Sequence, residues 1–276
     1  MVRGFSYGGT IYPITDFTAN YNRNLITEQG MGLGGEPTIY DGANIVTGSI
    51  GAVYRDSFAA FASPINNLLS GSSSTISTSA LVASDEFGGG SFPSSFVNSF
   101  ELTCASRDIA RVNMGFVSKG PVTSSTVATA ATYTAPVPIF WACAFKFDST
   151  VIKATSVSLR LEVPIDQDFY VIGNKYLDDI VQSGNGSLTG SISFGTNQWS
   201  YILDAMGSCG DIDADIILDL NGQSASNCTT SLIRTITITD AVASDSSFSG
   251  QNRNRFTKTL NWRAPVATST NNALFS

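Results

Sequence analysis

The sequence predicts a mainly β protein made of two similar β domains, residues 1–138 and 139–276. Short stretches of alternating apolar and polar residues dominate the chain, helix signals are few, and one strand motif occurs twice. The 276 residues leave room for two domains of ordinary size. Hydrophobic residues make up 42% of the chain, which is enough for a substantial core.

Five segments predict half-buried antiparallel strands, because their apolar residues recur with a period of two. They are residues 45–50, 97–104, 156–163, 232–239 and 256–262. A sixth segment, Ile139–Phe145, is apolar throughout and predicts a strand covered on both faces.

Two segments have helical spacing of apolar residues. The first, Tyr54–Leu69, contains Pro64, which predicts a kink or a division into two short pieces. The second is shorter, Gln198–Met206. The stretches 70–79 and 87–95 are rich in Gly and Ser and predict exposed loops.

An internal repeat is the most informative feature of the chain. The segments Asp41–Ile50 and Ser183–Ile192 both end in Thr-Gly-Ser-Ile, and a helix signal follows each. An extended segment that reaches Gly30 or Gly173 precedes each copy. The Ala-Pro-Val at 135–137 also recurs at 264–266, so we interpret the halves as copies of one domain of about 138 residues.

Composition excludes several classes of function. The chain has no histidine, which removes His-based triads and His metal sites. Its net charge of −7 gives no basic footprint for gripping nucleic acid. Only 13% of its residues are charged, about half of the roughly 25% usual in soluble domains. We expect no membrane span, since no apolar run approaches ~18 residues, and no secretion, since no apolar run of signal type opens the chain.

The motifs that suggest chemistry are weak. Gly30–Gly35 fits G-x-G-x-x-G, but no helix start follows it. The acids of 211–219 lack the Gly and Glu of a calcium loop, and the acid pairs at 166/168 and 178/179 are typical of solvated loops. We therefore predict no catalytic residue, cofactor or metal. Cys104 and Cys143 lie in apolar segments and are expected to be buried free thiols, whereas Cys209 and Cys228 could pair only in an oxidising compartment.

The second copy of the repeat carries a family resemblance. An alternating strand at 156–161 leads to Phe-Tyr-Val-Ile-Gly at 169–173, then Asp-Asp-Ile at 178–180 and Leu-Thr-Gly-Ser-Ile at 188–192. This order resembles the signature of bacteriophage tail tube proteins, as does the closing amphipathic strand at 255–262. The first copy departs from it, because the glycine-rich run 30–35 replaces the aromatic-aliphatic residues.

The resemblance implies that each half is a small β-sandwich or partial barrel of tail-tube type with one short flanking helix. It implies a non-enzymatic virion protein, assembled in the host cytoplasm, that stacks in rings as a hollow tail tube. DNA passes through the lumen without specific binding. A chain with two domains would form trimeric, pseudo-hexameric rings. Its partners would be itself, the tape measure, the tail terminator, a baseplate or initiator protein and, if the tail is contractile, a sheath.

The resemblance also gives the long polar segments a role, as arms between subunits or rings. We take eight positions to mark these segments: Gly30, Gly35, Gly42, Gly173, Gly184, Asp240, Arg253 and Arg255. Plain solvated loops are the alternative for all of them.

Two other functions fit the composition. A capsid, decoration or fibre protein would also contain β-sandwich domains rich in Ser and Thr. A carbohydrate-binding or carbohydrate-active β protein would need a cleft with exposed aromatic residues and paired carboxylates.

Overall fold

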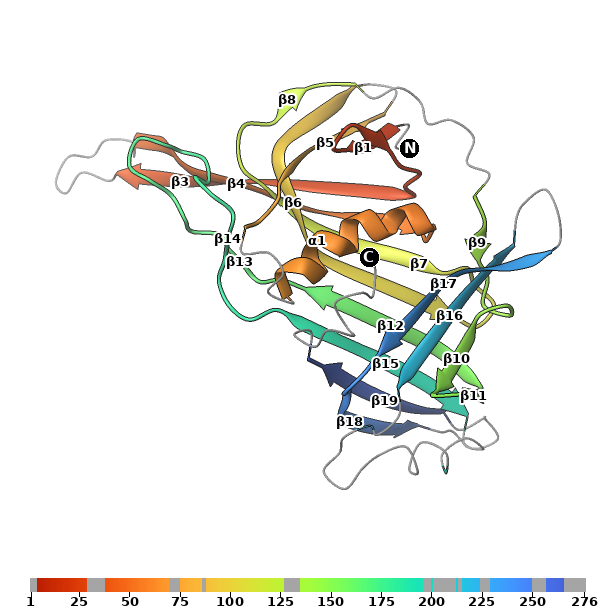
Figure 1. The fold of residues 1–276 in the computed structure, drawn as a ribbon. Helices are drawn as coiled ribbons and strands as arrows, with labels where there is room; N and C mark the ends of the chain where they lie inside the picture. The colour runs from red at the N-terminus through yellow and green to blue at the C-terminus, as the bar shows by residue number, and fades with distance from the viewer. Residues whose placement is uncertain are drawn as a thin grey trace.

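The computed structural model describes most of the chain as antiparallel β-sheet, which confirms the predicted mainly β class (Figure 1). The residues that it describes are 4–28, 38–69, 75–85, 88–126, 135–195, 200, 212, 215–223, 229–249 and 257–265.

The largest sheet contains a row of eight antiparallel strands, in the order β3-β4-β7-β6-β12-β15-β19-β18. Their bounds are β3 (Asp16–Glu28), β4 (Thr38–Val53), β7 (Arg111–Ser118), β6 (Gly89–Ala105), β12 (Ala154–Glu162), β15 (Ser187–Gly195), β19 (Thr257–Ala264) and β18 (Val242–Ser249). Four of the five predicted half-buried strands lie in this row. It crosses the midpoint of the chain without a break, because β6 of the first half pairs with β12 of the second.

The long strand β6 belongs to two layers. Its second half lies in the row, and its first half leaves the row to pair with β5 (Ser79–Ser84). Strand β1 (Gly4–Tyr7) follows β5, then β2 (Thr10–Ile11), and β8 (Thr123–Ser124) pairs with the other side of β6. The loop predicted at 87–95 is therefore wrong from Gly89 onwards. A Cβ at Gly89 would lie 2.4 Å from the Ser125 carbonyl oxygen, so this glycine permits close strand packing rather than a loop.

The second sheet has five strands and contains the fifth predicted strand. Its order is β11 (Thr150–Ile152), β10 (Ala144–Phe147), β16 (Ile216–Gln223) and β17 (Thr230–Ile238), with β9 (Val137–Pro138) also on β16. A separate short pair joins β13 (Ile165–Asp166) to β14 (Val181–Gln182).

The continuous strand predicted at Ile139–Phe145 is wrong. The amides of Ala142 and Cys143 both donate to the Ile139 carbonyl oxygen, at 3.0 and 3.1 Å, which closes a tight turn before β10 begins. This turn leaves the Trp141 side chain 60% exposed. An apolar run alone does not tell a strand from a turn that presents apolar side chains to solvent.

The predicted first helix is confirmed as two consecutive pieces, the 3₁₀ turn η1 (Asp56–Phe58) and α1 (Ala59–Leu69). The division predicted at Pro64 is wrong, because the two pieces meet before Ala59 and Pro64 lies inside α1. The helix packs Phe58 and Phe61 against Tyr12, with ring centroids 5.6 and 4.7 Å from the Tyr12 ring. The second predicted helix, 198–206, lies outside the described residues except for position 200.

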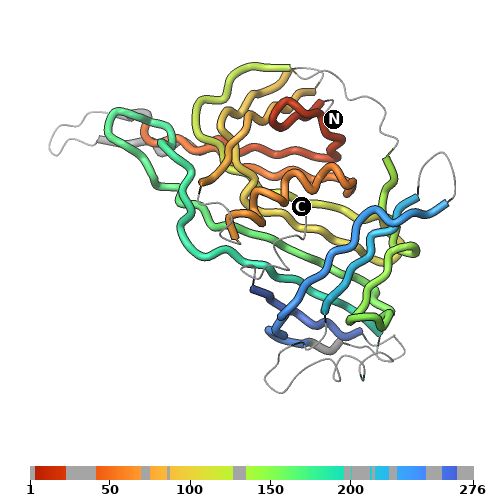
Figure 2. Tube along the Cα trace, viewed as in Figure 1, coloured from red at the N-terminus to blue at the C-terminus, as the bar shows by residue number. Residues whose placement is uncertain are grey.

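The strand pairings of the first half, drawn from red to yellow-green in Figure 2, recur in the second half, drawn from green to blue. The hairpin β1–β2 pairs through β1 with β5, as the hairpin β10–β11 pairs through β10 with β16. The triplet β3-β4-β7 has the arrangement of β12-β15-β19. Strands β17 and β18 correspond in turn to the first and second halves of β6.

The repeated Thr-Gly-Ser-Ile occupies the middle strand of each triplet. Gly48 pairs with Phe116 of β7, and Gly190 pairs with Trp262 of β19. An added Cβ would come within 2.5 Å of the Phe116 ring at Gly48 and within 2.2 Å of the Trp262 ring at Gly190. Each glycine thus makes room for a buried aromatic ring from the next strand, which is the physical reason for glycine in both copies.

The described apolar side chains of both halves form one contiguous core. It includes Phe100 of β6 and Leu161 of β12, which are paired across the junction of the halves. The division into domains at 138/139 stays a prediction.

We expect Gly48→Ala and Gly190→Ala each to lower the free energy of unfolding by at least about 1–3 kcal/mol, since each Cβ meets a packed ring and a backbone oxygen. Gly184→Ala is the matched control, because its Cβ would lie 3.7 Å from Pro164. Urea unfolding of the three variants measures this. Equal stability of Gly190→Ala and Gly184→Ala would contradict the packing account.

Candidate assembly surfaces

The eight-stranded row has one apolar face and one polar face, because side chains alternate along each strand. Leu159, Ile192 and Leu260 are buried on the apolar face. The opposite face carries hydroxyl, amide and a few charged groups, among them Thr18, Ser49, Asn113, Glu101, Ser158, Arg160, Ser191 and Asn261. A sheet face of this composition is suited to water rather than to a core.

Side chains on the polar face hydrogen bond to one another. The Ser158 and Ser191 hydroxyl oxygens lie 2.8 Å apart, and those of Ser193 and Thr259 lie 2.9 Å apart. The Arg160 guanidinium lies 3.0 Å from the Glu162 carboxylate and is opposite Glu101 in the strand register. This arginine is therefore neutralised locally, and the face offers little net positive charge to a polyanion.

Strands β3 and β18 are the two ends of the row. Each is paired on one side only, with β4 and β19 respectively, among the residues that the structure describes. The side chains Thr18–Asn22 and those of 244–246 are exposed. Such edges present backbone N–H and C=O groups that a further strand can pair with.

The predicted arms of the two copies lie side by side. The β3–β4 hairpin projects beyond the sheet, and the segment between β13 and β14 follows it (Figure 1). The backbone N–H of Asn44 donates to the Lys175 carbonyl oxygen at 2.7 Å. Gly42 and Gly173 line one shallow hollow between the two arms. Gly42 is a buried residue within β4 rather than a loop residue, whereas Gly173 is exposed.

One lysine fixes the base of the segment between β13 and β14, which we call the second arm. The Lys119 ammonium, just after β7, donates to the Asp178 carbonyl oxygen at 2.7 Å and to the Asp179 carboxylate at 2.9 Å. The hydrogen bond from Lys119 lowers the pKa of Asp179, and the Ile180 amide adds to this effect. An opposite charge and hydrogen bonds to the ionised form both favour the carboxylate.

The other predicted arm positions are dispersed. Gly184 is exposed just after β14, and Asp240 lies between β17 and β18 with a φ of 55°. Asp240 thus lies at the opposite end of β18 from the segment expected to reach Arg255. Gly30, Gly35, Arg253 and Arg255 lie outside the described residues.

The second arm ends in an exposed apolar tip, residues 169–172. Its side chains are exposed to 42% at Phe169, 44% at Val171 and fully at Ile172. These residues belong to the segment that resembles the family signature, and their exposure to solvent was not predicted from the sequence. Four apolar residues ahead of a turn glycine were the available signal.

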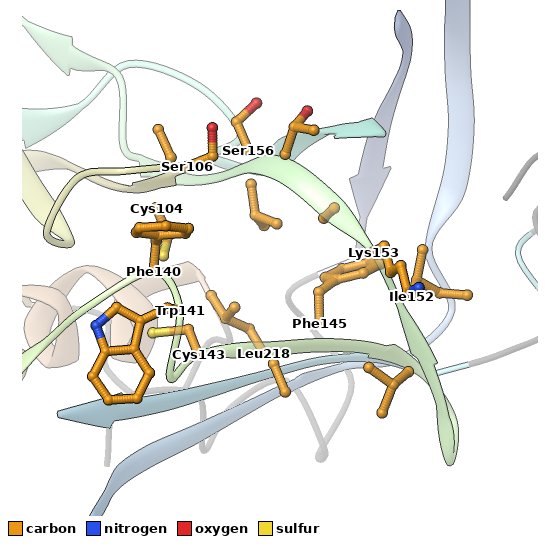
Figure 3. Close-up of a pocket in the computed structure, with 16 residues that line it drawn as sticks. Cys104, Ser106, Phe140, Trp141, Cys143, Phe145, Ile152, Lys153, Ser156 and Leu218 are labelled. Atoms are coloured by element: carbon orange, nitrogen blue, oxygen red, sulfur yellow. The ribbon is translucent and has the colours of Figure 1, made fainter. Parts of the chain in front are cut away.

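At the other end of the strands, a cavity of about 310 Å³ opens between β12 and β10 (Figure 3). Phe140, Trp141 and Cys143 lie at one end of it, and Ile152 and Lys153 at the other. Sequence reasoning missed this cavity, because the turn at 139–143 was predicted as a strand.

Both cysteines of this cavity are free thiols, as predicted, although Cys143 is only half-buried. A hydrogen bond with Cys104 lowers the pKa of Cys143, and the same contact together with burial raises the pKa of Cys104. Cys209 and Cys228 lie beyond the described residues.

In the described part of the chain, the acidic residues do not gather into a group that could hold a metal ion. Asp166 accepts the Asp168 amide at 2.9 Å, a local turn contact. Asp219 pairs with Lys146 at 2.5 Å on the second sheet. Of the described helices, none is long and apolar enough to span a membrane.

Comparison with protein-family models gives one finding. The model described as "Phage tail tube protein" matches residues 58–264, which is three quarters of the chain. A search of curated proteins finds no match.

We expect acid to loosen the second arm. The pKa of Asp179 is lower in the folded chain than in the unfolded one, so its pairing stabilises the arm above about pH 4 and is lost as pH falls below that. The protection factors of the amides of residues 168–178, which are exchange rates corrected for the intrinsic effect of pH, should fall on acidification. Lys119→Met should lower them at pH 7 by about fivefold, the effect of an exposed charge pair, and remove the acid response. An acid response that persists in Lys119→Met would contradict this assignment.

Proposed function

Because the chain belongs to the phage tail tube protein family, and is thus a structural protein of the phage tail, we propose that it polymerises into stacked rings whose lumen conducts DNA. Three copies, each with two tube units, form one pseudo-hexameric ring. The rings assemble in the host cytoplasm, and the chain has no enzymatic role.

The observation that carries the proposal is the relation between the free edges and the internal repeat. In the repeat, β3 corresponds to β12, and β18 corresponds to the second half of β6. Strands β6 and β12 pair with each other inside the chain. The edge β18 of one copy can therefore pair with the edge β3 of the next in the same way, which joins copies into a continuous sheet.

The correspondence gives the register of this contact. Ala19 and Leu159 both lie opposite the repeated glycine. Asp16 of β3 therefore corresponds to Ser156 of β12, and the residues that follow correspond one by one. The unpaired extra residue of β6, between Val97 and Ser99, matches that of β18, between Ala243 and Asp245. Within the chain Glu162 pairs with Ser99. The equivalent pair between copies is Asn22 with Asp245.

Closure of such a ring removes every free edge of the row. Eight strands from each of three copies would line the lumen. We place the polar face toward the lumen, since the apolar face is covered by the second sheet and α1. Its hydroxyl groups, and Arg160 paired with Glu162, would bind a DNA phosphate backbone weakly, because that binding depends on unneutralised cations that release counterions.

The arms give the stack its direction. The two arms of the chain extend to the same side, beyond one end of the strands (Figure 1). A ring with arms on one face contacts the next ring head to tail, and such heterologous contacts build filaments instead of closed shells. We infer that the tape measure, tail terminator, initiator and any sheath bind the faces or the outside of this tube.

Negative-stain images of the purified protein, across a range of concentrations, test the proposal. We expect hollow tubes of uniform diameter built from rings with three-fold symmetry. Monomers at all concentrations, closed icosahedral shells, or rings of a symmetry that is not a multiple of three would contradict it.

A cysteine pair tests the edge contact. We expect Asn22→Cys with Asp245→Cys to form disulfides between copies, because the register places these positions opposite each other. Non-reducing electrophoresis should show trimers. The control, Thr18→Cys with Asp245→Cys, displaces one partner by four residues, about 13 Å along the strand, and should not link. Equal linking in both variants would rule out this register.

A further inference from the structure

We propose that the apolar tip, residues 169–172 of one copy, inserts into the cavity between β12 and β10 of a second copy in the next ring. This inference rests on the proposed function, and it identifies which surfaces of the chain meet between rings.

The tip is a poor surface to leave in water. Ile172 is fully exposed, and Phe169 and Val171 are exposed to more than 40%. Contiguous exposed apolar side chains of this kind often mark interaction sites, whereas single exposed apolar residues are ordinary on protein surfaces. In the described chain, no other segment presents three such side chains within four residues.

The tip is also fixed in shape before any partner binds. The Asn174 amide donates to the Val171 carbonyl oxygen at 3.1 Å, and Gly173 has a φ of 94°, as in a type II turn with Ile172 at its corner. The Asp178 amide closes the loop onto the Phe169 carbonyl oxygen at 3.1 Å. A preformed tip loses little conformational entropy when it docks.

The cavity has the complementary character. Its volume of about 310 Å³ equals that of about ten water molecules, which is room for branched aliphatic side chains. Exposed apolar residues form its rim, Trp141 and Val151 at about 60% and Phe140 at 37%. Phe145, Ile152 and Leu218 line its buried side.

The tip and the cavity cannot meet within one copy. The tip follows the C-terminal end of β12, and the cavity is lined by Ala154–Val157 at the N-terminal end of the same strand. The two features therefore lie beyond opposite ends of strand β12 (Figure 1). A tip and a receiving cavity at opposite ends of one chain make a heterologous contact, which repeats from copy to copy.

Two single variants and their mixture test the contact. Ile172→Asp removes the tip and Val151→Asp spoils the cavity, and both positions are exposed, so the fold is retained. We expect each variant to form rings that do not stack, with a concentration threshold for tubes at least about tenfold higher than that of the wild type. Leu232→Asp, equally exposed on β17 and not among the residues that line the cavity, is the control and should form tubes normally.

The mixture distinguishes a head-to-tail contact from every other kind. Rings of Ile172→Asp keep intact cavities, and rings of Val151→Asp keep intact tips. When mixed they should form pairs of rings but no tubes. A contact between identical surfaces would give no pairs in the mixture.

Thiol labelling gives a second readout. In a Cys209→Ser/Cys228→Ser background, maleimide should label Cys143 in monomers and at least about tenfold more slowly in tubes, because the docked tip covers the cavity.

Tubes from Ile172→Asp, or Cys143 labelling that does not change on assembly, would overturn the inference and leave the proposed function intact. If the wild-type protein forms neither rings nor tubes, the proposed function itself fails.

Discussion

The structure depends on the need of every β-strand to satisfy its backbone hydrogen bonds. Inside the row, each strand from β4 to β19 has partners on both sides, and the whole core is built on the apolar face of these strands. At β3 and β18 the described chain supplies only one partner. A single copy therefore ends in two open edges, and neither of these two described strands is very short or contains proline, which are two of the ordinary ways of blunting an edge.

The internal repeat gives these edges their complement. The chain already solves the problem once, at the β6–β12 junction, where the last strand of one unit pairs with the first strand of the next. The edge strands β18 and β3 share the bulge and the side-chain alternation of β6 and β12, so two copies can pair through them in the same way. The low charge of the chain fits the proposed assembly, because a surface that packs against identical copies of itself tolerates few like charges.

Sequence reasoning predicted the features that follow from local periodicity and repetition. The alternating strands, η1 with α1, and the matching positions of Gly48 and Gly190 follow from residue spacing alone. It failed where the type of side chain does not determine the path of the backbone. The stretch at 89–95 looks like a loop, yet its small residues allow β5 and β6 to approach closely. The segment 139–145 is apolar enough for a buried strand, yet one carbonyl oxygen accepts two amides and turns it outward. For 89–95 the deciding partners, β5 and Ser125, lie outside the segment. For 139–145 the turn is local, but an apolar composition alone does not distinguish it from a strand.

The assembly surfaces show the same limit more sharply. The resemblance to tail tube proteins drew attention to both arms, but it could not show that Gly42 and Gly173 come together, because 130 residues separate them in the chain. Nor could it show that the aromatic-aliphatic run of 169–172 leaves its valine and isoleucine in solvent while Lys119 holds the loop beneath it. Holding an apolar tip rigidly in water costs free energy in an isolated subunit. The same rigid tip favours binding when the subunit lies between two others. The arrangement is therefore better explained by the assembled tube than by the stability of the single chain.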